Sequence, residues 1–205
     1  MKLIFATNNS HKLHEVQEKL RVRSGEACLA TTQIKIVSLA EIGFSEDIPE
    51  TGDTLQANAL QKAQTIYNFC HQNCFADDTG LEIEALNGEP GVYSARYAER
   101  CGVASNTPTF DDNINLVLSK LHGKTNRKAC FKTVIALILN GEIFYFEGRV
   151  DGEIITEKHG VEGFGYDPIF RPDGYKKTFA ELPLDEKNQI SHRARAVDKL
   201  VEFLT

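Results

Sequence analysis

An Asn-Gly dipeptide between two long apolar stretches is the feature that most limits how this chain can fold. Asn140-Gly141 separates CFKTVIALIL from EIFYFEGRV. Asn-Gly favours the tight turn that joins two antiparallel strands, because both central residues of that turn need a positive φ. The sequence therefore predicts a hairpin at this point, and the sheet that contains it must include antiparallel neighbours.

Strand and helix patterns alternate in the first part of the chain. The expected strands cover 2–7, 33–39 and 74–78. The expected helices begin near Ser10, near Asp53, at Thr107 with Pro108 in the first turn, and at Ser191. Together with the hairpin, this order predicts an α/β protein with a mixed sheet and flanking helices. No repeat and no linker rich in Pro, Gly or Ser divides the sequence, so we expect a single domain over 1–205.

Composition and charge narrow the class of protein. Hydrophobic residues make up 41% of the chain, enough to build a core, and the short apolar run at the N-terminus does not resemble a signal peptide. No segment approaches the roughly eighteen apolar residues of a membrane helix. The five cysteines are scattered and odd in number, which indicates reduced thiols, buried as small hydrophobic side chains, in a cytoplasmic protein. A net charge of −6 argues against a nucleic-acid partner but allows a small anionic ligand.

Two of the expected helices carry cations in their first turns. His11 and Lys12 lie in one, and His192 and Arg193 lie in the other. Because a helix N-terminus carries roughly half a positive charge, cations there are unfavourable unless an anion is present. Free backbone N–H groups, a hydroxyl and a Lys or Arg together form a phosphate-binding site. The alternative is that all four side chains are solvated surface residues.

Two adjacent carboxylates, Asp77 and Asp78, follow a strand that is expected to be buried. Like charges this close repel unless a cation lies beside them. Mg²⁺ binds through one or two carboxylates together with substrate phosphates, and Glu50 supplies a further acid. The acids and the phosphate site predict metal-assisted chemistry on a phosphoester or anhydride, in which one carboxylate activates a water. In the alternative, Asp77 forms a turn and Asp78 caps a helix.

The segment VEGFGYDPIF, residues 161–170, predicts a ligand-binding loop. Its glycines permit close approach of the backbone. Phe164 and Tyr166 offer faces for stacking, which contributes about 1–3 kcal/mol per base in single-strand binders. Asp167 is placed to accept hydrogen bonds from ring N–H groups. Lys187 either reaches the same ligand or is a surface lysine, and the alternative for the whole segment is a Gly-rich turn with core aromatics.

Five segments together resemble a known family. FATNNSHK, ETGDTLQANALQKA, ADDTGLEIEALNGEPGVYSARYA, GFGYDPIF and EKNQISHRARA are similar to segments of the non-canonical purine nucleoside triphosphate pyrophosphatases, the inosine/xanthosine triphosphatase or HAM1-like family. The match runs in order from Phe5 to the final helix. It implies a long mixed sheet with helices in two lobes, a substrate cleft between the lobes, and a homodimer. It also implies Mg²⁺-dependent hydrolysis of ITP, dITP and XTP to monophosphate and pyrophosphate.

The resemblance further implies individual roles. Asp78 matches the general base and a metal ligand, and Glu50 matches the other metal-linked acid. The residues implied to bind the substrate are Thr7, Asn8, Asn9, Ser10, His11, Lys12, Thr79, Phe164, Gly165, Tyr166, Asp167, Lys187, His192 and Arg193. Of these, Lys12 is implied to bind the phosphates, with Lys62 as a further phosphate contact. The loop 164–167, Lys187, His192 and Arg193 are implied to surround the purine.

The family usually has Thr-Gly-Asn where this chain has Thr7-Asn8-Asn9. Asn tolerates positive φ better than most residues, so we expect Asn8 to preserve the shape of the loop. Two other functions remain open: a nucleotide-binding sensor without turnover, and a phosphatase that removes the γ-phosphate. The acids at 50, 77 and 78 argue against the sensor. The sequence predicts neither the preferred triphosphate nor the role of Asp77, of the polar segment 21–33, or of any dimer interface.

Overall fold

A computed structural model describes residues 1–26, 34–103 and 109–205, and its strands form one mixed sheet. The order is β2-β1-β3-β5-β6-β7, with β4 beside β3. The strands are β1 (Lys2–Phe5), β2 (Lys35–Val37), β3 (Cys74–Ile83), β4 (Pro90–Gly91), β5 (Lys128–Leu139), β6 (Glu142–Ile154) and β7 (Phe170–Pro172). β1 is parallel to β2 and β3, whereas β4 and β7 are antiparallel to β3 and β6. The predicted α/β fold with a mixed sheet is confirmed.

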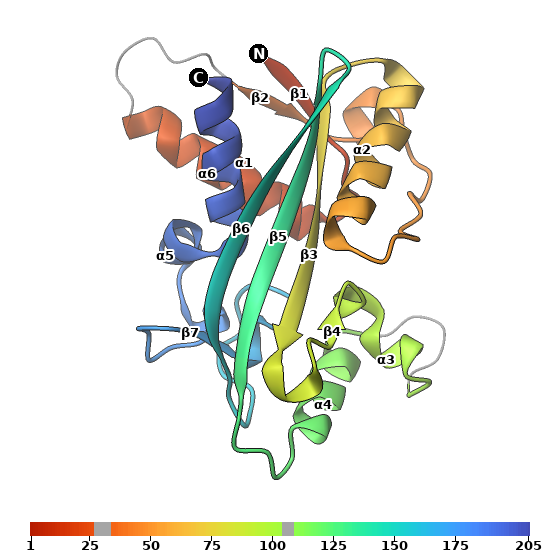
Figure 1. The fold of residues 1–205 in the computed structure, drawn as a ribbon. Coiled ribbons are helices and arrows are strands. Elements are labelled where there is room, and N and C mark those ends of the chain that lie inside the picture. Colours follow the sequence, from red (N-terminus) through yellow and green to blue (C-terminus); the bar gives the residue numbers. More distant parts are fainter. Residues whose placement is uncertain (27–33, 104–108) are drawn as a thin grey trace. The chain divides into compact units, whose positions relative to one another are not determined.

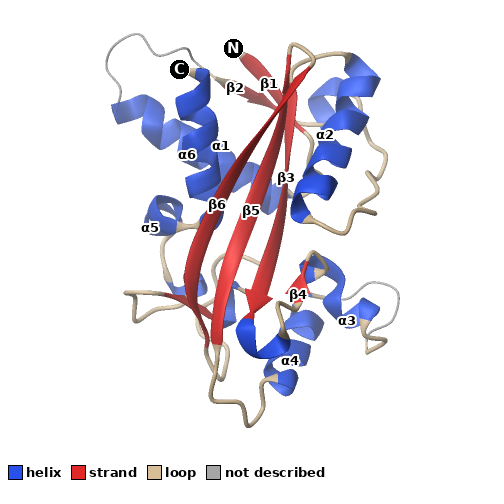
Figure 2. Cartoon of the chain, in the orientation of Figure 1, coloured by secondary structure: helices blue, strands red, loops and turns tan. Residues whose placement is uncertain are grey.

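Helices connect most of these strands (Figure 2). The α-helices are α1 (Ser10–Glu26), α2 (Leu55–Cys70), α3 (Tyr97–Arg100), α4 (Phe110–Lys120), α5 (Leu184–Ile190) and α6 (His192–Leu204). Single 3₁₀ turns are η1 (Ala40–Ile42), η2 (Glu84–Leu86), η3 (Ser94–Arg96), η4 (Asp167–Ile169) and η5 (Phe179–Glu181).

The helix caps follow the sequence prediction in one case and shift in the others. Ser191 caps α6 as predicted, since its hydroxyl accepts a hydrogen bond from Ala194 N. At α1 the capping acceptor is Asn9, not Ser10, because Asn9 Oδ1 accepts from Lys12 N at 3.1 Å. Thr54, not Asp53, caps α2. Thr109 caps α4 through a capping box, and the expected cap at 107–108 lies outside the described residues.

The hairpin predicted from Asn140-Gly141 is present between β5 and β6. Asn140 has φ 52° and Gly141 has φ 86°. Positive φ at both central residues is what the favoured two-residue hairpin turn requires. The long strands that this turn joins are hydrogen-bonded neighbours in the sheet.

The chain divides into two compact units, so each is described by itself. Unit 1 comprises Met1–Asp78, Thr133–Gly148 and Ser191–Thr205, and unit 2 comprises Thr79–Lys132 and Arg149–Ile190. The single domain, expected from the sequence, and the two lobes with a cleft between them, implied by the family resemblance, stay predictions.

Unit 1 has a core on each face of its part of the sheet. Strand side chains alternate between faces, and consecutive side chains of β1 accordingly pack in different cores. Phe5 stacks on Phe75 at 4.5 Å and packs in the core that contains Val197 of α6. Ile4 packs in the other core, together with Ala59 of α2. Figure 1 shows α2 on one face of β1 and β3, and α1 and α6 on the other.

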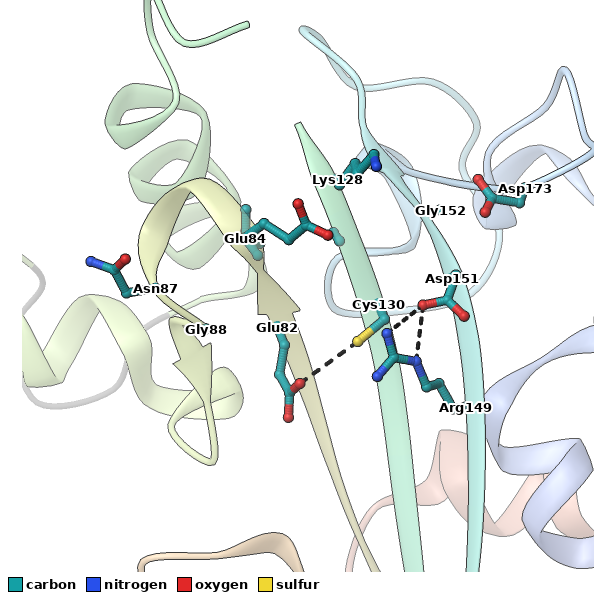
Figure 3. A pocket seen from close by; sticks show the side chains of 12 residues that line it. Glu82, Glu84, Asn87, Gly88, Lys128, Cys130, Arg149, Asp151, Gly152 and Asp173 are labelled. Carbon is teal, nitrogen blue, oxygen red and sulfur yellow. Dashed lines mark hydrogen bonds and ion pairs between the residues drawn. The ribbon is translucent and has the colours of Figure 1, made fainter. Parts of the chain in front are cut away.

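Unit 2 buries one face of its strands and leaves the other polar. Leu81 and Phe131 point into a core that includes Ile114 and Val117 of α4 and its C-cap residue Leu121, all buried as predicted. On the opposite face a hollow of about 580 Å³ is lined by Glu82, Cys130, Arg149 and Asp151, among others (Figure 3). None of the predicted site residues lines this hollow.

The described cysteines are free thiols, but they are not all buried as the sequence analysis expected. Cys74 and Cys130 are buried and Cys70 is half-buried, whereas Cys101 is exposed. Within the described ranges, no helix combines the length and the apolar content needed to cross a bilayer.

Candidate active site

The two adjacent acids lie inside β3, not at its end. The strand continues to Ile83, and both side chains are buried, with Asp77 2% and Asp78 6% exposed. The expected strand exit was wrong, and so were the alternative roles of turn former and helix cap. Because neighbouring strand residues face opposite ways, Asp77 points toward α1 and α6 and Asp78 toward α2. Each carboxylate therefore has its own set of partners.

Asp77 is held by the cations at the two helix N-termini. Lys12 Nζ donates to Asp77 Oδ1 at 3.0 Å, and Arg193 Nε donates to Asp77 Oδ2 at 3.1 Å. Arg193 also forms a short ion pair with Glu15 of α1. The anion inferred from the misplaced cations is thus, in this structure, the protein's own Asp77.

The pKa values of this network show which groups stay charged. Burial opposes ionisation of Asp77, but Lys12 and Arg193 outweigh it and hold the pKa of the carboxyl far below its usual range. Burial also disfavours the charged form of Arg193, yet Glu15 and Asp77 raise the pKa of the guanidinium. Asp77 therefore stays charged at neutral pH and is a poor proton acceptor.

Lys12 differs from Arg193 in the direction of its pKa shift. Burial lowers the pKa of its amine, and the neighbouring cations Lys62 and Arg193 add to this, although Asp77 opposes it. A further anion beside Lys12 would stabilise the charged form. The residue is thus suited to bind a phosphate as well as Asp77.

On the other face of β3, Asp78 lies against α2. Asn58 Nδ2 donates to Asp78 Oδ2 at 3.2 Å and Lys62 Nζ donates to Asp78 Oδ1 at 3.2 Å. Lys62 Nζ also donates to Glu50 through a short bond. Asn58 and Lys62 are four residues apart, so one face of α2 presents both to the strand.

The proton affinity of Asp78 differs from that of its neighbour. Burial, reinforced by the charge of Glu50, raises the pKa of Asp78 above its usual value, although Lys62 opposes this. Burial opposes the charge on Lys62 as well, but Asp78 and Glu50 raise the pKa of its amine. One acid of the pair is thus tied to cations and stays ionised, while the other binds protons more readily.

The donor set around Asp78 fits a hard divalent cation. Glu50 and Asp78 both reach the same ammonium nitrogen, so their oxygens converge on a position that already holds a positive charge. Oxygen donors are what Mg²⁺ binds. In the part of the chain that the structure describes, no group of three or more His, Cys, Asp or Glu could hold a metal. Further ligands to an ion here would have to come from substrate phosphates and water.

The segment Thr7–Lys12 is ordered by its own side chains. Asn9 N donates to Thr7 Oγ1 at 3.2 Å, and Asn8 Nδ2 donates to Glu46 O at 3.4 Å. Asn8 is not among the described residues with positive φ, so the expected reason for Asn at this position was wrong. Ser10 and His11 are exposed.

The surface alternative for the cationic residues was wrong for most of them. His192 and Arg193 are 3% and 2% exposed. Lys12 is half-buried in its pair with Asp77, and only His11 is exposed as that alternative required.

In unit 2, the predicted ligand loop is built around a buried carboxylate. Asp167 Oδ2 accepts hydrogen bonds from Phe164 N at 2.8 Å and from Lys187 Nζ at 2.7 Å. Lys187 is 2% exposed, so the surface alternative was wrong for this lysine. Its Nζ also lies 5.4 Å from the centre of the Phe164 ring.

Phe164 and Tyr166 have different environments. Phe164 is half-buried, whereas Tyr166 is 4% exposed, packs in the core of unit 2 and donates through its hydroxyl to Ser94 O. Tyr166 thus behaves as a core aromatic, and Phe164 has the more accessible ring. The substrate roles of the loop and of Thr79, which is half-buried in unit 2, stay predictions.

The sequence analysis missed Glu15 as a member of the network. Its position three residues after Lys12 places it on the same helix face, which was the available signal. Lys62 was expected to contact phosphate, and the structure shows it between two acids.

Comparison with known proteins places the chain in a family. The model of the Ham1 family matches residues 3–203. The dITP/XTP pyrophosphatase of Flavobacterium johnsoniae is 50% identical over 205 residues, covering 100% of this chain and 98% of the relative. That of Porphyromonas gingivalis is 50% identical over 204 residues, covering 99% and 97%.

Solved structures agree in fold. The Ham1 protein of Staphylococcus aureus matches with a TM-score of 0.82 at 36% identity, covering 100% of this chain and 98% of its own. A HAM1 protein from Coxiella burnetii matches with a TM-score of 0.84 at 39% identity and the same coverage. The fold of this chain thus defines an α/β class of protein with solved representatives. The chain is a member of the Ham1 family.

Proposed function

We propose that this chain hydrolyses the non-canonical purine nucleoside triphosphates dITP, XTP and ITP to the monophosphate and pyrophosphate. The relatives named dITP/XTP pyrophosphatase, at 50% identity over essentially the whole chain, support this substrate class. The observation that carries the chemistry is the contrast between the two acids of β3. Asp77 is neutralised by Lys12 and Arg193, while Asp78 keeps a raised pKa beside Lys62.

Asp78 is the general base in this proposal. It accepts a proton from a water whose oxygen attacks the α-phosphorus, and the bond from that phosphorus to the pyrophosphate oxygen breaks. Lys12 and Lys62 stabilise negative charge on the phosphates, and the positive end of the α1 helix dipole adds to this effect.

We further propose that Mg²⁺ is the cofactor. Glu50 and Asp78 would hold it, because their oxygens already converge on one positive charge. When bound, the ion neutralises charge on the triphosphate. Lys62 then serves as the second cation of this site and keeps the two carboxylates from repelling each other.

The loop of unit 2 recognises the base in this proposal. Phe164 offers a ring for stacking, and Lys187 is held beside it by Asp167. A lysine ammonium has donors and no acceptor. It therefore favours a 6-keto group, which accepts hydrogen bonds, over the 6-amino group of adenine. His192 and Arg193 are assigned to the purine by resemblance, although the observed contacts of Arg193 are with acids.

The family resemblance supports two further assignments, a homodimer and a cytoplasmic location. The free thiols of the described cysteines are compatible with a reducing compartment.

A substrate panel with product identification tests the function. ITP, dITP, XTP, ATP and GTP are incubated with the protein, with and without Mg²⁺, and the products are separated. We expect monophosphate and pyrophosphate from ITP, dITP and XTP, but not from ATP, only when Mg²⁺ is present. GTP also carries a 6-keto group, so its rate tests whether selection extends beyond that group. Diphosphate and inorganic phosphate would instead indicate a γ-phosphatase. Binding without any product would indicate a sensor, and equal rates for ATP and ITP would remove the keto-purine preference.

A further inference from the structure

The first residue of α4, Phe110, is a large apolar side chain that the fold leaves exposed. Its side chain is 46% exposed, although unit 2 has an extensive core to which α4 contributes Ile114 and Val117. A single exposed apolar side chain is normal on a protein surface, so the exposure of Phe110 alone indicates nothing about its role. What Phe110 contacts is therefore informative.

The ring of Phe110 lies against the ring of Phe164. Their centroids are 6.1 Å apart and their planes are inclined by 49°. This separation is within the range of favourable aromatic pairs. Phe164 is the more accessible aromatic of the ligand loop, so Phe110 touches the side chain to which base stacking is assigned.

Both sides of this contact are fixed to the rest of unit 2. The start of α4 is held by the capping box of Thr109 and Asp112. Lys158 Nζ, which precedes the ligand loop, donates to Asp111 Oδ1 at 2.8 Å. Phe164 N is bonded to the buried Asp167. The phenyl–phenyl contact thus joins two anchored backbones.

We propose that Phe110 is a positioning residue for the purine subsite. It limits the rotation of the Phe164 ring and adds apolar surface beside it, so the ring is ordered before the base arrives. Ordering a side chain before binding removes an entropic cost from association. The inference rests on the proposed function and extends it, because it assigns part of the affinity for the base to a helix outside the ligand loop.

The test is Phe110→Ala, with KM and kcat measured for ITP and inhibition constants measured for IMP and for inorganic triphosphate. Loss of an aromatic pair of ordinary strength should raise the KM for ITP and the inhibition constant of IMP by about 2- to 10-fold. The kcat and the inorganic triphosphate constant should stay within about 1.5-fold, because neither depends on the base. Phe110→Tyr keeps a ring and should restore the wild-type KM.

Phe69→Ala is the matched control. Phe69 is 52% exposed and also contacts one aromatic ring, that of Phe44 at 5.2 Å, but it lies at the end of α2 in unit 1. It should leave KM unchanged. A KM within 1.5-fold of wild type in Phe110→Ala, or an equal weakening of inorganic triphosphate, would overturn the proposal.

The wild-type protein separates this failure from failure of the proposed function. If wild-type protein releases no pyrophosphate from ITP, the proposed function falls. The affinity of IMP for wild type and Phe110→Ala is then compared by calorimetry. Weaker binding to the variant supports the role of Phe110, whereas equal or absent binding refutes it.

Discussion

Arg193, in the first turn of the last helix, forms a buried ion pair with Asp77, 116 residues earlier in the chain and in the middle of β3. Lys12, from the first helix, takes the other oxygen of the same carboxylate. One strand acid therefore pairs with a cation from each of two helix N-termini. Asp78, the next residue of the strand, points to the opposite face and has different partners.

Replacing Asp77 should destabilise the fold. In Asp77→Asn, two largely buried cations lose their shared anion, although Glu15 still pairs with Arg193. Removing one partner of a buried ion pair costs about 3–5 kcal/mol. We expect a loss of about 3 kcal/mol in the free energy of unfolding, measured by urea denaturation. A loss below about 1 kcal/mol would show that the network contributes little.

Because of Asp77, the free energy of unfolding should also fall at acidic pH. The pKa of Asp77 is lower in the folded protein than in the unfolded chain. Such a group stabilises the fold above its unfolded pKa, about 3.9, and this contribution is lost as pH falls through the folded value. The stability difference between wild type and Asp77→Asn should thus be constant from about pH 5 to 8 and shrink below about pH 4. A difference that grows in acid would contradict this sign.

Replacing Asp78 should act on turnover. Asp78→Asn removes the proton acceptor but keeps an oxygen that can accept from Lys62. General base catalysis contributes about 10²- to 10⁴-fold, so we expect a loss of that order in kcat, measured as pyrophosphate release from ITP. The circular dichroism spectrum should stay unchanged. Turnover near the wild-type rate would refute the assignment.

The two acids also show which features of the structure could be predicted from the sequence. The alternation of apolar residues, the Asn-Gly turn and the helix face of Ile114, Val117 and Leu121 are local signals, and the structure confirms them. The cations at two helix starts led us to expect a bound phosphate, which stays a prediction, and the anion that the structure shows beside them is Asp77. That the anion is Asp77 depends on the pairing of β1 with β3, which no local pattern in the sequence contains.

The sequence analysis ended β3 too early, at Asp78, for a related reason. An Asp-Asp pair is unfavourable inside a strand by propensity, and only the partners on both faces make it tolerable. Those partners come from α1, α2 and α6. The contact between Phe110 and Phe164 likewise links residues distant in sequence, so it gave no signal in either segment.

Removing the ammonium of Lys62 should move the pH dependence of the reaction. Burial raises the pKa of Asp78, and the charge of Lys62 is the strongest influence that opposes this. In Lys62→Met the pKa of Asp78 should rise further, so the base becomes protonated at a higher pH. We expect the acid limb of the kcat/KM profile to shift upward in pH, together with a fall in kcat.

Lys132→Met is the control for that shift. Lys132 pairs with Glu82 on the polar face of unit 2, and its side chain is more exposed than that of Lys62. It should leave the acid limb where it is in the wild type. An unmoved limb in Lys62→Met would mean that Asp78 does not set the limb or that Lys62 does not control its pKa.

The ligand loop depends on a glycine for a steric reason. Gly163 has φ +74°, and a Cβ at this position would lie 2.2 Å from Asp167 Oδ2. In Gly163→Ala the Asp167 carboxylate must therefore move, and its hydrogen bonds to Phe164 N and Lys187 Nζ are disturbed. We expect KM for ITP to rise by about tenfold or more, as for the loss of one charge-assisted hydrogen bond.

Gly174→Ala is the matched control, since Gly174 has φ +83° with no atom within 4 Å of the added Cβ. Both variants carry the strain of a positive φ, so a difference in KM between them isolates the contact with Asp167. Equal KM values in the two variants would show that the position of Asp167 does not matter for binding of the base.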